Sequence, residues 1–544
     1  MKLWKRLSCF LIFTYKRGVN FLRAKIFDST LRDGAQAEGI SFLVGDKIKI
    51  AKALDDLGVD FIEAGNPGSN QKDMEFFHVA KSLTFKHSKL VAFGSTRRCN
   101  TIAQDDANLN ALLEAGTDYV CIFGKSWDFH VTEIINTSLE ENISMIEDTI
   151  LYLRSKNKHV FFDAEHFFDG FKGNKEYALK TLKAAEDAGA ECIILCDTNG
   201  GTFPDEMVEI IKEVKENIHT ELGIHAHNDS GMAVSLSVLA VLNGVTQVQG
   251  TFLGYGERCG NANLSAIIAN LELKRNILCL PEGNIKELTN TARIIAEISN
   301  FKLLGTLPFV GETAFAHKAG MHVDGVFKNS KSFEHISPEL VGNERKFLIS
   351  EVAGKATVLA KIQKIYPNVE KNDPRLSMII QRIKDLEYLG YQFEGADASF
   401  ELIVHKTFGA FKPFFQVLDF KTIGEGPSKA NLHSSAAIIK VSVEGIEEIT
   451  AANGDGPVDA LNEALRKAIG RFYPILNMVH LSDYKVRILD GKESATAAKT
   501  RVLIESTDGA YTWSTVGVSK DIIEASFKAL IDSIEYKLFK ENNK

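Results

Sequence analysis

Short apolar runs and amphipathic stretches alternate along the chain from Lys25 to about residue 290. The runs are rich in β-branched and aromatic residues, whereas stretches between them, such as residues 47–58 and 178–189, place apolar residues at helical spacing. This alternation predicts βα units around a parallel sheet. The eight strand candidates are residues 24–34, 60–67, 89–97, 118–126, 159–166, 191–200, 222–229 and 246–254. Eight strands over about 250 residues is the count of a (β/α)8 barrel, or TIM barrel.

Each predicted strand begins apolar and ends in side chains that a packed core would not contain. The C-terminal strand ends form the active face of such a barrel. An open, doubly wound sheet is the alternative fold, but its first strand is usually followed by GxGxxG, which residues 31–36 (LRDGAQ) do not match. We therefore expect an active site built from strand-end residues, which include Arg32, Asp33, Glu63, Ser95, Lys125, Glu165, Asp197, Thr198, His225 and His227.

The spacing of His225 and His227 predicts a metal site. They are separated by one residue in a predicted strand, so their side chains point to the same side. Two neutral imidazoles and a carboxylate, which Asp33 can supply, suit a divalent ion. In the glycine-rich loop 254–263, Asn261 offers a carbonyl ligand or a hydrogen bond to a ligand histidine. The alternative is a pair of hydrogen-bonded loop histidines without a metal.

Arg32 directly precedes Asp33. A guanidinium beside a metal-bound carbonyl stabilises negative charge that forms on oxygen, which makes Arg32 a candidate catalytic residue. Its alternative role is an ion pair with Glu165 or Glu63. Cys259 has no adjacent histidine, and we assign it no role.

Composition narrows the function classes. The 544 residues suggest two to four units, and the net charge of −8 with well-mixed charges argues against nucleic-acid binding. The seven cysteines form no regular pattern, which favours a reducing cytoplasm over a disulfide framework. Residues 1–24 are basic and contain an apolar stretch too short to span a membrane. We expect an N-terminal extension there, with a targeting peptide as the alternative.

The pattern changes to strand-rich segments from about Ala396. Residues 435–470 and 498–534 each show a strand pair that leads through a glycine-containing turn into an amphipathic helix, with Pro457 near the start of the first helix. This predicts a duplicated α+β unit without catalytic side chains, suited to assembly or effector sensing. The expected domains are 1–24, 25–290 (barrel), 291–392 (small helical linker subdomains) and 393–544 (C-terminal α+β domain).

Two segments carry a family resemblance. LRDGAQ, followed by ten residues and then Lys47, and HAHNDSGMAV, which runs on to GYGERCGN, resemble the two signatures of the 2-isopropylmalate and homocitrate synthases. Within that group, residues 28–42, 65–77, 93–98, 162–170 and 337–356 look most like the citramalate synthases. The resemblance runs from Lys25 to the C-terminus.

The resemblance implies an acyltransferase that carries out a Claisen-type condensation. Pyruvate would bind the metal (Mn2+, Mg2+, Zn2+ or Co2+), the methyl group of acetyl-CoA would attack its keto carbon, and thioester hydrolysis would release citramalate and CoA. By motif, Asp33, His225 and His227 carry over as metal ligands with Asn261 near the metal. Thr198 carries over as a contact to the keto-acid carboxylate, and Glu165 as the active-site glutamate.

Residues 313–325 resemble the linker subdomain in which a histidine, here His322, reaches the active site of a neighbouring subunit for acid/base assistance, with Asp324 nearby. Its alternative role is to cap a helix. Where the synthases usually have a tyrosine shortly after this histidine, the chain has Phe333. The C-terminal domain resembles the allosteric domain of the isopropylmalate synthases, which implies a homodimer with isoleucine as effector. A simple dimerisation domain is the alternative.

Other functions are open from sequence alone. The same chemistry on 2-oxoisovalerate or 2-oxoglutarate would make 2-isopropylmalate or homocitrate, and Lys125 and Arg97 are the basic residues that could hold a distal carboxylate. Arg97 and Arg98 could instead meet CoA phosphates. A lyase of the same fold lacks a third domain, and an amino-acid sensor would not need Arg32 with the metal ligands.

Overall fold

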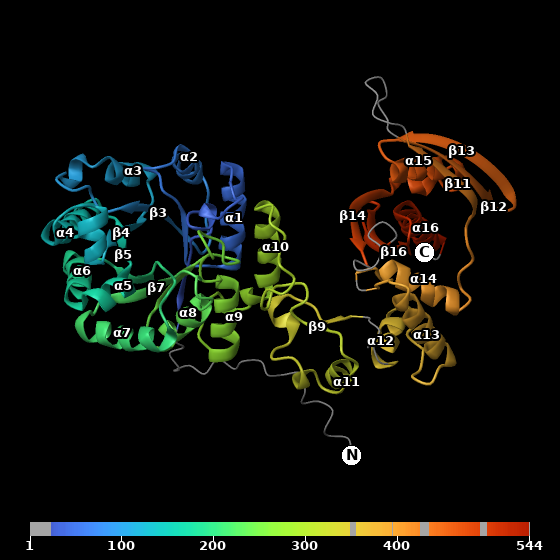
Figure 1. Cartoon of the computed structure of the whole chain (residues 1–544). Helices are drawn as coiled ribbons and strands as arrows, with labels where there is room; N and C mark the ends of the chain where they lie inside the picture. The colour runs from blue at the N-terminus through green and yellow to red at the C-terminus, as the bar shows by residue number, and fades with distance from the viewer. Residues whose placement is uncertain (1–22, 349–354, 394, 425–434, 490–497, 543–544) are drawn as a thin grey trace, which may run out of the picture. The chain divides into compact units, whose positions relative to one another are not determined.

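The computed structural model describes residues 23–348, 355–393, 395–424, 435–489 and 498–542. The predicted N-terminal extension therefore lies outside the described residues, apart from Arg23 and Ala24. The chain divides into two compact units, one of residues 1–315 with 336–344 and the other of residues 316–335 with 345–544 (Figure 1). Within the described ranges, no helix is both long enough and apolar enough to cross a membrane.

Eight parallel strands form a closed barrel in the first unit, and the last strand pairs with the first. This arrangement confirms the predicted TIM barrel. The strands are β1 (Lys25–Asp28), β2 (Phe61–Gly65), β3 (Lys89–Ser95), β4 (Tyr119–Lys125), β5 (His159–Glu165), β6 (Cys192–Asp197), β7 (Glu221–Ala226) and β8 (Gln247–Gly250).

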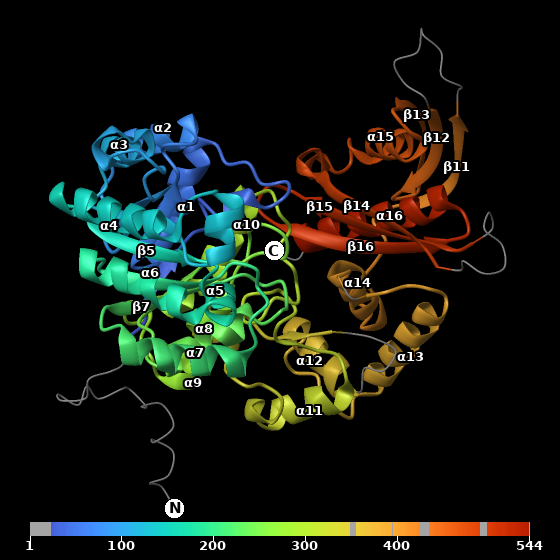
Figure 2. The same ribbon diagram turned by 60° about the vertical axis from the view of Figure 1, so that its left-hand side comes forward.

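Helices surround the barrel because each crossover between parallel strands buries one apolar helix face against the sheet (Figure 2). They are α1 (Val44–Leu57), α2 (Gln71–Ala80), α3 (Ala107–Ala115), α4 (Leu139–Ser155), α5 (Phe167–Gly173), α6 (Lys175–Ala188), α7 (Pro204–Asn217), α8 (Ala233–Leu242) and α9 (Leu264–Arg275). After the barrel, α10 (Leu288–Ile298) packs against α1.

Aromatic side chains fill the inside of the barrel. Phe27, Phe61 and Phe161 are buried there, and the ring centroids of Phe61 and Phe161 are 5.0 Å apart in an edge-on arrangement. The barrel is therefore a packed core and not a pore. Asp163 and Gln249 place buried polar side chains closer to the C-terminal strand ends.

The second unit begins with short elements around a buried carboxylate. β9 (Ala316–His317) pairs with β10 (Lys346–Phe347), and Glu334 accepts hydrogen bonds from Arg345 at 2.5 and 2.6 Å. The helices of this part are α11 (Gly320–Lys328), α12 (Lys355–Ile365), α13 (Pro374–Tyr388) and α14 (Asp397–Thr407).

The rest of the second unit consists of two similar halves, each with three antiparallel strands followed by a helix. The elements are β11 (Gln416–Gly424), β12 (Ser435–Val443), β13 (Ile446–Gly454), α15 (Pro457–Ile469), β14 (His480–Ile488), β15 (Thr500–Thr507), β16 (Thr512–Ser519) and α16 (Ile522–Asn542). The predicted strand pairs are present as β12 with β13 and β15 with β16, and each half has one further strand, β11 or β14, that was not predicted. β11 and β14 are mostly exposed strands, so they lack the alternation that marks a half-buried strand.

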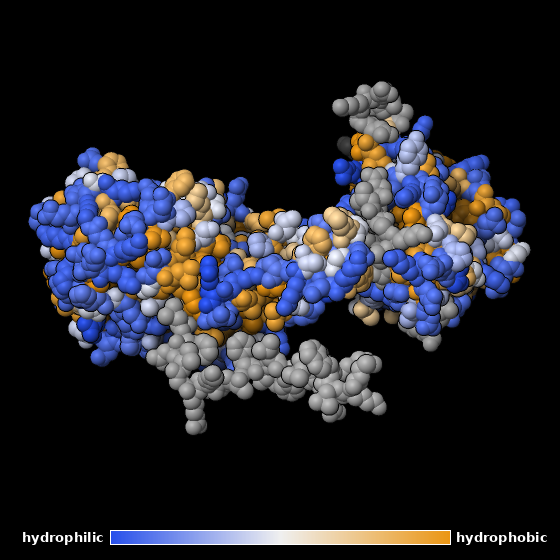
Figure 3. Space-filling view, turned by 90° about the horizontal axis from the view of Figure 1, so that it is seen from below, coloured by the Kyte–Doolittle hydropathy of each residue, from blue (hydrophilic) through white to orange (hydrophobic). Residues whose placement is uncertain are grey.

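The exterior of the protein mixes charged and apolar residues. One face of the molecule shows hydrophilic side chains interspersed with smaller apolar areas (Figure 3). This mixture agrees with the composition, because the chain has 25% charged residues of both signs.

Candidate metal centre and substrate cavity

Asp33, His225 and His227 come together at the C-terminal end of the barrel. Asp33 follows β1, His225 lies near the end of β7, and His227 follows that strand directly. One potential ligand atom from each residue lies within 4.8 Å of the others. The two Nε2 atoms are 3.4 Å apart, and Nε2 of His225 is 3.9 Å from Oδ2 of Asp33. In the structure, as the spacing of His225 and His227 predicted, potential ligand atoms of both histidines and of Asp33 converge on one point.

His225 is oriented by Gln249 of β8. Oε1 of Gln249 lies 3.0 Å from Nδ1 of His225, so Nδ1 carries the proton and the lone pair of Nε2 faces the centre of the site. The amide of Gln249 is itself fixed, because its Nε2 donates to Asp163 at 3.0 Å. Burial first, and Glu63 second, raise the pKa of Asp163 to about 7.

Asn261 lies against the cluster. Its Nδ2 donates to Oδ1 of Asp33 at 2.7 Å, while its Oδ1 is buried without a hydrogen-bond partner among the described residues. The loop reaches this position because Gly256, at φ 149°, has no Cβ. A Cβ there would lie 2.2 Å from Nδ2 of Asn261. A buried carbonyl oxygen without a donor fits a site for a cation.

The protonation states of the cluster suit a divalent ion. Burial raises the pKa of Asp33, but the adjacent Arg32 guanidinium and other neighbours outweigh burial and bring it down to about 2. Burial, with His227 adding to it, lowers the pKa of His225 to about 4, and burial also lowers the pKa of His227. One carboxylate and two neutral imidazoles are a donor set that divalent transition ions accept.

Three neighbouring side chains hold the guanidinium group of Arg32 in place. Its Nε donates to Glu63 at 2.6 Å, its Nη1 donates to Asp33 at 2.8 Å, and its Cζ lies 3.8 Å from the ring centroid of Phe93. The ion pair with Glu63 that the sequence offered as an alternative role is therefore present. Glu165 instead pairs with Lys125. Arg32 also borders the cavity, so the ion pair with Glu63 is compatible with the predicted catalytic role.

A cavity of about 260 Å3 opens over the cluster. Glu165 and Thr198 border it together with Arg32, Asp33, His225 and His227. The other expected strand-end residues, Glu63, Ser95, Lys125 and Asp197, do not line it, and Asn261 hydrogen-bonds to Asp33 instead. Phe93 and Phe123 stack at a centroid distance of 5.4 Å and form an apolar part of its lining.

The hydroxyl group of Thr198 can donate a hydrogen bond to a ligand in the cavity. Its Oγ1 accepts the backbone N–H of His166 at 2.9 Å, so its own hydroxyl proton is available to a ligand in the cavity. His166 holds an unfavourable left-handed backbone conformation, at φ 57°, directly after Glu165. Nη2 of Arg258 also donates to the backbone carbonyl of Thr198 at 2.7 Å. The loop that carries Thr198 is thus fixed from two sides.

Comparison with known proteins covers nearly the whole chain. Three family models match it: HMGL-like over residues 23–295, homocitrate synthase post-HMGL domain-like over residues 309–389, and LeuA allosteric (dimerisation) domain over residues 394–538. The chain is 51% identical to the (R)-citramalate synthase of Aquifex aeolicus and 50% identical to that of Geobacter sulfurreducens, in each case over 95% of this chain and 98% of the relative. The chain belongs to the citramalate synthase family.

A 2-isopropylmalate synthase is less similar to this chain in sequence. The 2-isopropylmalate synthase of Methanocaldococcus jannaschii is 32% identical over 95% of both chains. The two citramalate synthases therefore have higher identity to this chain over the same share of its length. These matches confirm the family, the barrel with its helical and allosteric-type C-terminal domains, and the acyltransferase class that were predicted from the sequence.

His322, the remaining predicted site residue of this citramalate synthase family member, lies in the second unit. It is part of α11, where its ring stacks on Phe333 at a centroid distance of 4.1 Å and an angle of 21°. It lies two residues inside α11 and is not the N-cap, which is Ala319, so the helix-capping role is wrong. Phe333 thus contacts the histidine through its ring face.

Sequence reasoning missed several residues of the site. Gln249, His166 and Arg258 were not singled out, and Lys125 was not paired with Glu165. Gln249 could have been found, because it is a polar residue within a predicted barrel strand. The role of His166 rests on its backbone conformation, which the sequence does not display.

Proposed function

We propose that the protein condenses acetyl-CoA with pyruvate and water to give (R)-citramalate and CoA. The observation that carries this proposal is the convergence of Asp33, His225 and His227 beneath a small cavity that Arg32 and Thr198 also border. The names of the relatives support the same reaction. Such a reaction would supply the pyruvate route to isoleucine.

The metal centre would hold Mn2+, Mg2+, Zn2+ or Co2+ through Asp33, His225 and His227, with Asn261 beside Asp33. A bound divalent ion supplies Lewis acidity that polarises a ketone and orients it. The carbonyl oxygen of Asn261, buried without a partner among the described residues, supports a place for it near the ion. Arg32 lies next to Asp33 and would stabilise negative charge that develops on the substrate oxygen.

Pyruvate fits the lining better than its larger relatives. The hydroxyl of Thr198 would donate to its carboxylate, and the stacked rings of Phe93 and Phe123 leave room for a small alkyl group. For 2-oxoglutarate a free cation would be needed, but Lys125 pairs with Glu165, and Arg97 pairs with acids on α4 at 2.7 and 2.8 Å. 2-Isopropylmalate synthesis from 2-oxoisovalerate is the runner-up.

The reaction needs one proton removed and one thioester cleaved. A base takes a proton from the methyl group of acetyl-CoA, the new C–C bond forms at the keto carbon, and the former ketone oxygen gains a proton. Water then cleaves the thioester and CoA leaves as the thiol. Glu165, at the cavity wall, and His322, from a neighbouring subunit, are the proposed acid/base groups.

The second unit would regulate the enzyme. We propose that residues 393–544 form the dimerisation and effector domain, with isoleucine bound where two such domains meet, and that residues 25–290 and 291–392 are the catalytic and linker domains. The match to the LeuA allosteric (dimerisation) model supports a homodimer. We propose a cytoplasmic location for this biosynthetic enzyme.

Release of CoA thiol tests the function. Purified protein is mixed with acetyl-CoA and pyruvate, 2-oxobutanoate, 2-oxoisovalerate or 2-oxoglutarate, after removal of metal with a chelator and again after addition of each candidate ion. Pyruvate should give the highest kcat/KM, and only with metal. His227→Ala should abolish turnover while exposed His219→Ala should not. A preference for 2-oxoisovalerate would favour the runner-up, and turnover with none of the four would refute the proposal.

A further inference from the structure

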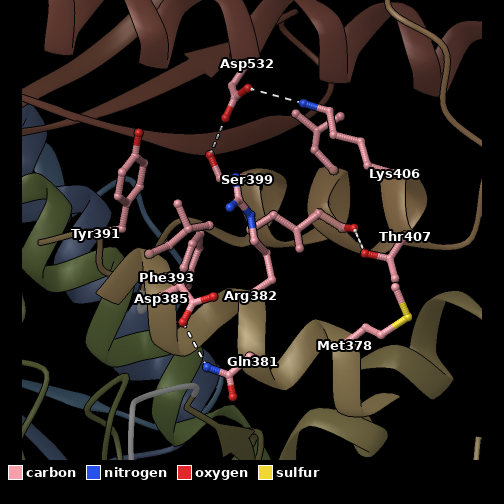
Figure 4. A pocket seen from close by; sticks show the side chains of 13 residues that line it. Met378, Gln381, Arg382, Asp385, Tyr391, Phe393, Ser399, Lys406, Thr407 and Asp532 are labelled. Carbon is pink, nitrogen blue, oxygen red and sulfur yellow. Dashed lines mark hydrogen bonds and ion pairs between the residues drawn. The ribbon is translucent and has the colours of Figure 1, made fainter. Parts of the chain in front are cut away.

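A second cavity lies outside the barrel. It has a volume of about 810 Å3 and lies within the second unit, between α13, α14 and α16 (Figure 4). This volume falls in the range of about 300–1,000 Å3 that is usual for pockets that bind small molecules. None of its lining residues belongs to the site described above.

One part of the lining is apolar. Phe393 and Leu402 are buried, and Leu386 and Ile403 are half-buried, while Met378 is exposed at the edge of the cavity. Such a surface binds an aliphatic or aromatic group and gains about 25 cal/mol for each Å2 of apolar area that leaves water.

On the α16 side, Asp532 lines the cavity, and the buried Glu535 lies close to it outside the lining. Asp532 and the buried Glu535 share one cation, Lys406, whose Nζ lies 3.9 and 3.7 Å from their carboxylate oxygens. Both distances exceed a normal hydrogen bond. Asp532 also accepts a hydrogen bond from Ser399 at 3.2 Å. Burial raises the pKa of both acids, although Lys406 acts in the opposite direction.

The α13 side offers a cation. Arg382 points into the cavity (Figure 4) and makes no ion pair or hydrogen bond with any other described residue. Its neighbour Asp385 is instead bound by Gln381 at 2.8 Å. A free guanidinium is the group that best binds a carboxylate through two parallel hydrogen bonds.

We propose that this cavity binds an α-amino acid with an apolar side chain. The carboxylate of the ligand pairs with Arg382, its ammonium group lies against Asp532, and its side chain packs on Phe393 and Leu402. The cavity thus offers a cation and an acid, Arg382 and Asp532, beside an apolar surface. A zwitterion with an apolar side chain requires these three features.

Other ligand classes fit the cavity less well. A nucleotide or CoA carries several negative charges and needs an excess of cations. The lining instead contains two acids, Asp385 and Asp532, for its two cations, Arg382 and Lys406. A simple carboxylate would leave the excess negative charge beside Lys406 unpaired. An amine without a carboxylate would leave Arg382 without a partner.

A ligand in this cavity connects two parts of the chain. α13 belongs to the segment that matches the homocitrate synthase post-HMGL model, and α14 and α16 belong to the segment that matches the LeuA model. Occupancy would therefore hold α13 against α14. This site lies within one chain and is separate from the effector site proposed at the meeting of two C-terminal domains, so it does not depend on the proposed function.

Calorimetric titration of the full-length protein tests the proposal. The probes are L-isoleucine, L-leucine and L-phenylalanine, together with 4-methyl-2-oxopentanoate, which lacks the ammonium group of leucine, and 3-methylbutylamine, which lacks its carboxylate. At least one amino acid should bind, and both truncated probes should bind about tenfold more weakly or worse. Hydrogen exchange should show that the bound amino acid slows the amides of α13 and α14.

Variants locate the site. Arg382→Gln should weaken this binding by about tenfold or more, whereas Lys384→Gln, also exposed on α13 but outside the cavity, should not change it. Asp532→Asn should weaken binding of the amino acid but not of the 2-oxo acid. The effector site elsewhere would persist in all three variants as a separate set of sites. Equal binding by wild type and Arg382→Gln, or no binding of any amino acid, would overturn the proposal.

Discussion

Gln249 and His225 form a hydrogen bond across neighbouring barrel strands, with Oε1 of Gln249 at 3.0 Å from Nδ1 of His225. This contact fixes both the ring orientation and the tautomer of His225, which leaves Nε2 free to bind an ion. Gln249 thus orients the ligand candidate His225 through a neutral amide. It lies on β8, a strand that supplies none of the proposed ligands.

Gln249→Leu should lower metal affinity about 10- to 100-fold while His225 itself is retained. Titration of the metal-free protein with Mn2+ or Zn2+ checks this. Gln247→Leu is the matched control, since Gln247 lies on the same strand and its buried amide has no hydrogen-bond partner among the described residues. The control should bind metal normally and be at least as stable as the wild type. Equal affinity in both variants would remove Gln249 from the metal site.

Thr198→Val should raise KM for pyruvate by about tenfold or more, because valine has the same shape but cannot donate to the carboxylate. KM for acetyl-CoA should change little. Thr198→Ser keeps the hydroxyl that accepts the N–H of His166, and it should restore most of the affinity. Steady-state kinetics on both substrates distinguish the variants, and a similar loss in both of them would assign Thr198 a packing role.

Phe123→Ala should shift substrate preference towards larger 2-oxo acids. Its ring stacks on Phe93 at the cavity wall, and removal creates space for one or two more carbon atoms. The ratio of kcat/KM for 2-oxobutanoate to that for pyruvate should rise by about tenfold, since one methylene group is worth roughly 10- to 200-fold in such a pocket. An unchanged ratio would place the alkyl group of the substrate elsewhere in the cavity.

Glu535 should make stability depend on pH. Burial raises its pKa to about 7, above that of an unfolded-state carboxyl, so the folded state favours the protonated form. The stabilising effect of protonation is complete below about pH 4.5 and is lost as the pH rises through 7. Glu535→Gln should therefore increase the free energy of unfolding at pH 8 by roughly 1 to 3 kcal/mol and have little effect at pH 5.

Denaturant unfolding of the full-length protein at both pH values measures this difference. Exposed Glu463→Gln on α15 serves as the control and should leave the pH profile unchanged. If Glu535→Gln were equally destabilising at pH 5 and pH 8, the hydrogen bonding of Glu535 and not its charge would dominate.

The sequence by itself determined the barrel and the identity of its reactive groups. Eight apolar runs that end in polar residues allow few folds, and all eight are strands of the closed barrel. The i, i+2 spacing of His225 and His227 is enough to place both rings on one side of a strand. These features are local, since strand period and apolar content act over a few residues.

Exposed strands and long-range contacts could not be predicted from the sequence. β11 and β14 carry little alternation because both of their faces are largely exposed, so each half of the C-terminal part was predicted with one strand too few. The pairing of Lys125 with Glu165 joins the ends of two strands 40 residues apart, and the sequence offered Arg32 as a partner for Glu165 with equal reason.

Only the tertiary structure decided which polar groups meet. Asp33 and Asn261 are 228 residues apart in sequence, and their hydrogen bond exists because closure of the barrel brings β1 beside β8. Likewise, Arg382 and Asp532 face one cavity only because α13 and α16 pack in the same unit. Sequence patterns record how each segment buries its own apolar side, whereas hydrogen bonds and charge balance depend on neighbours that folding alone brings together.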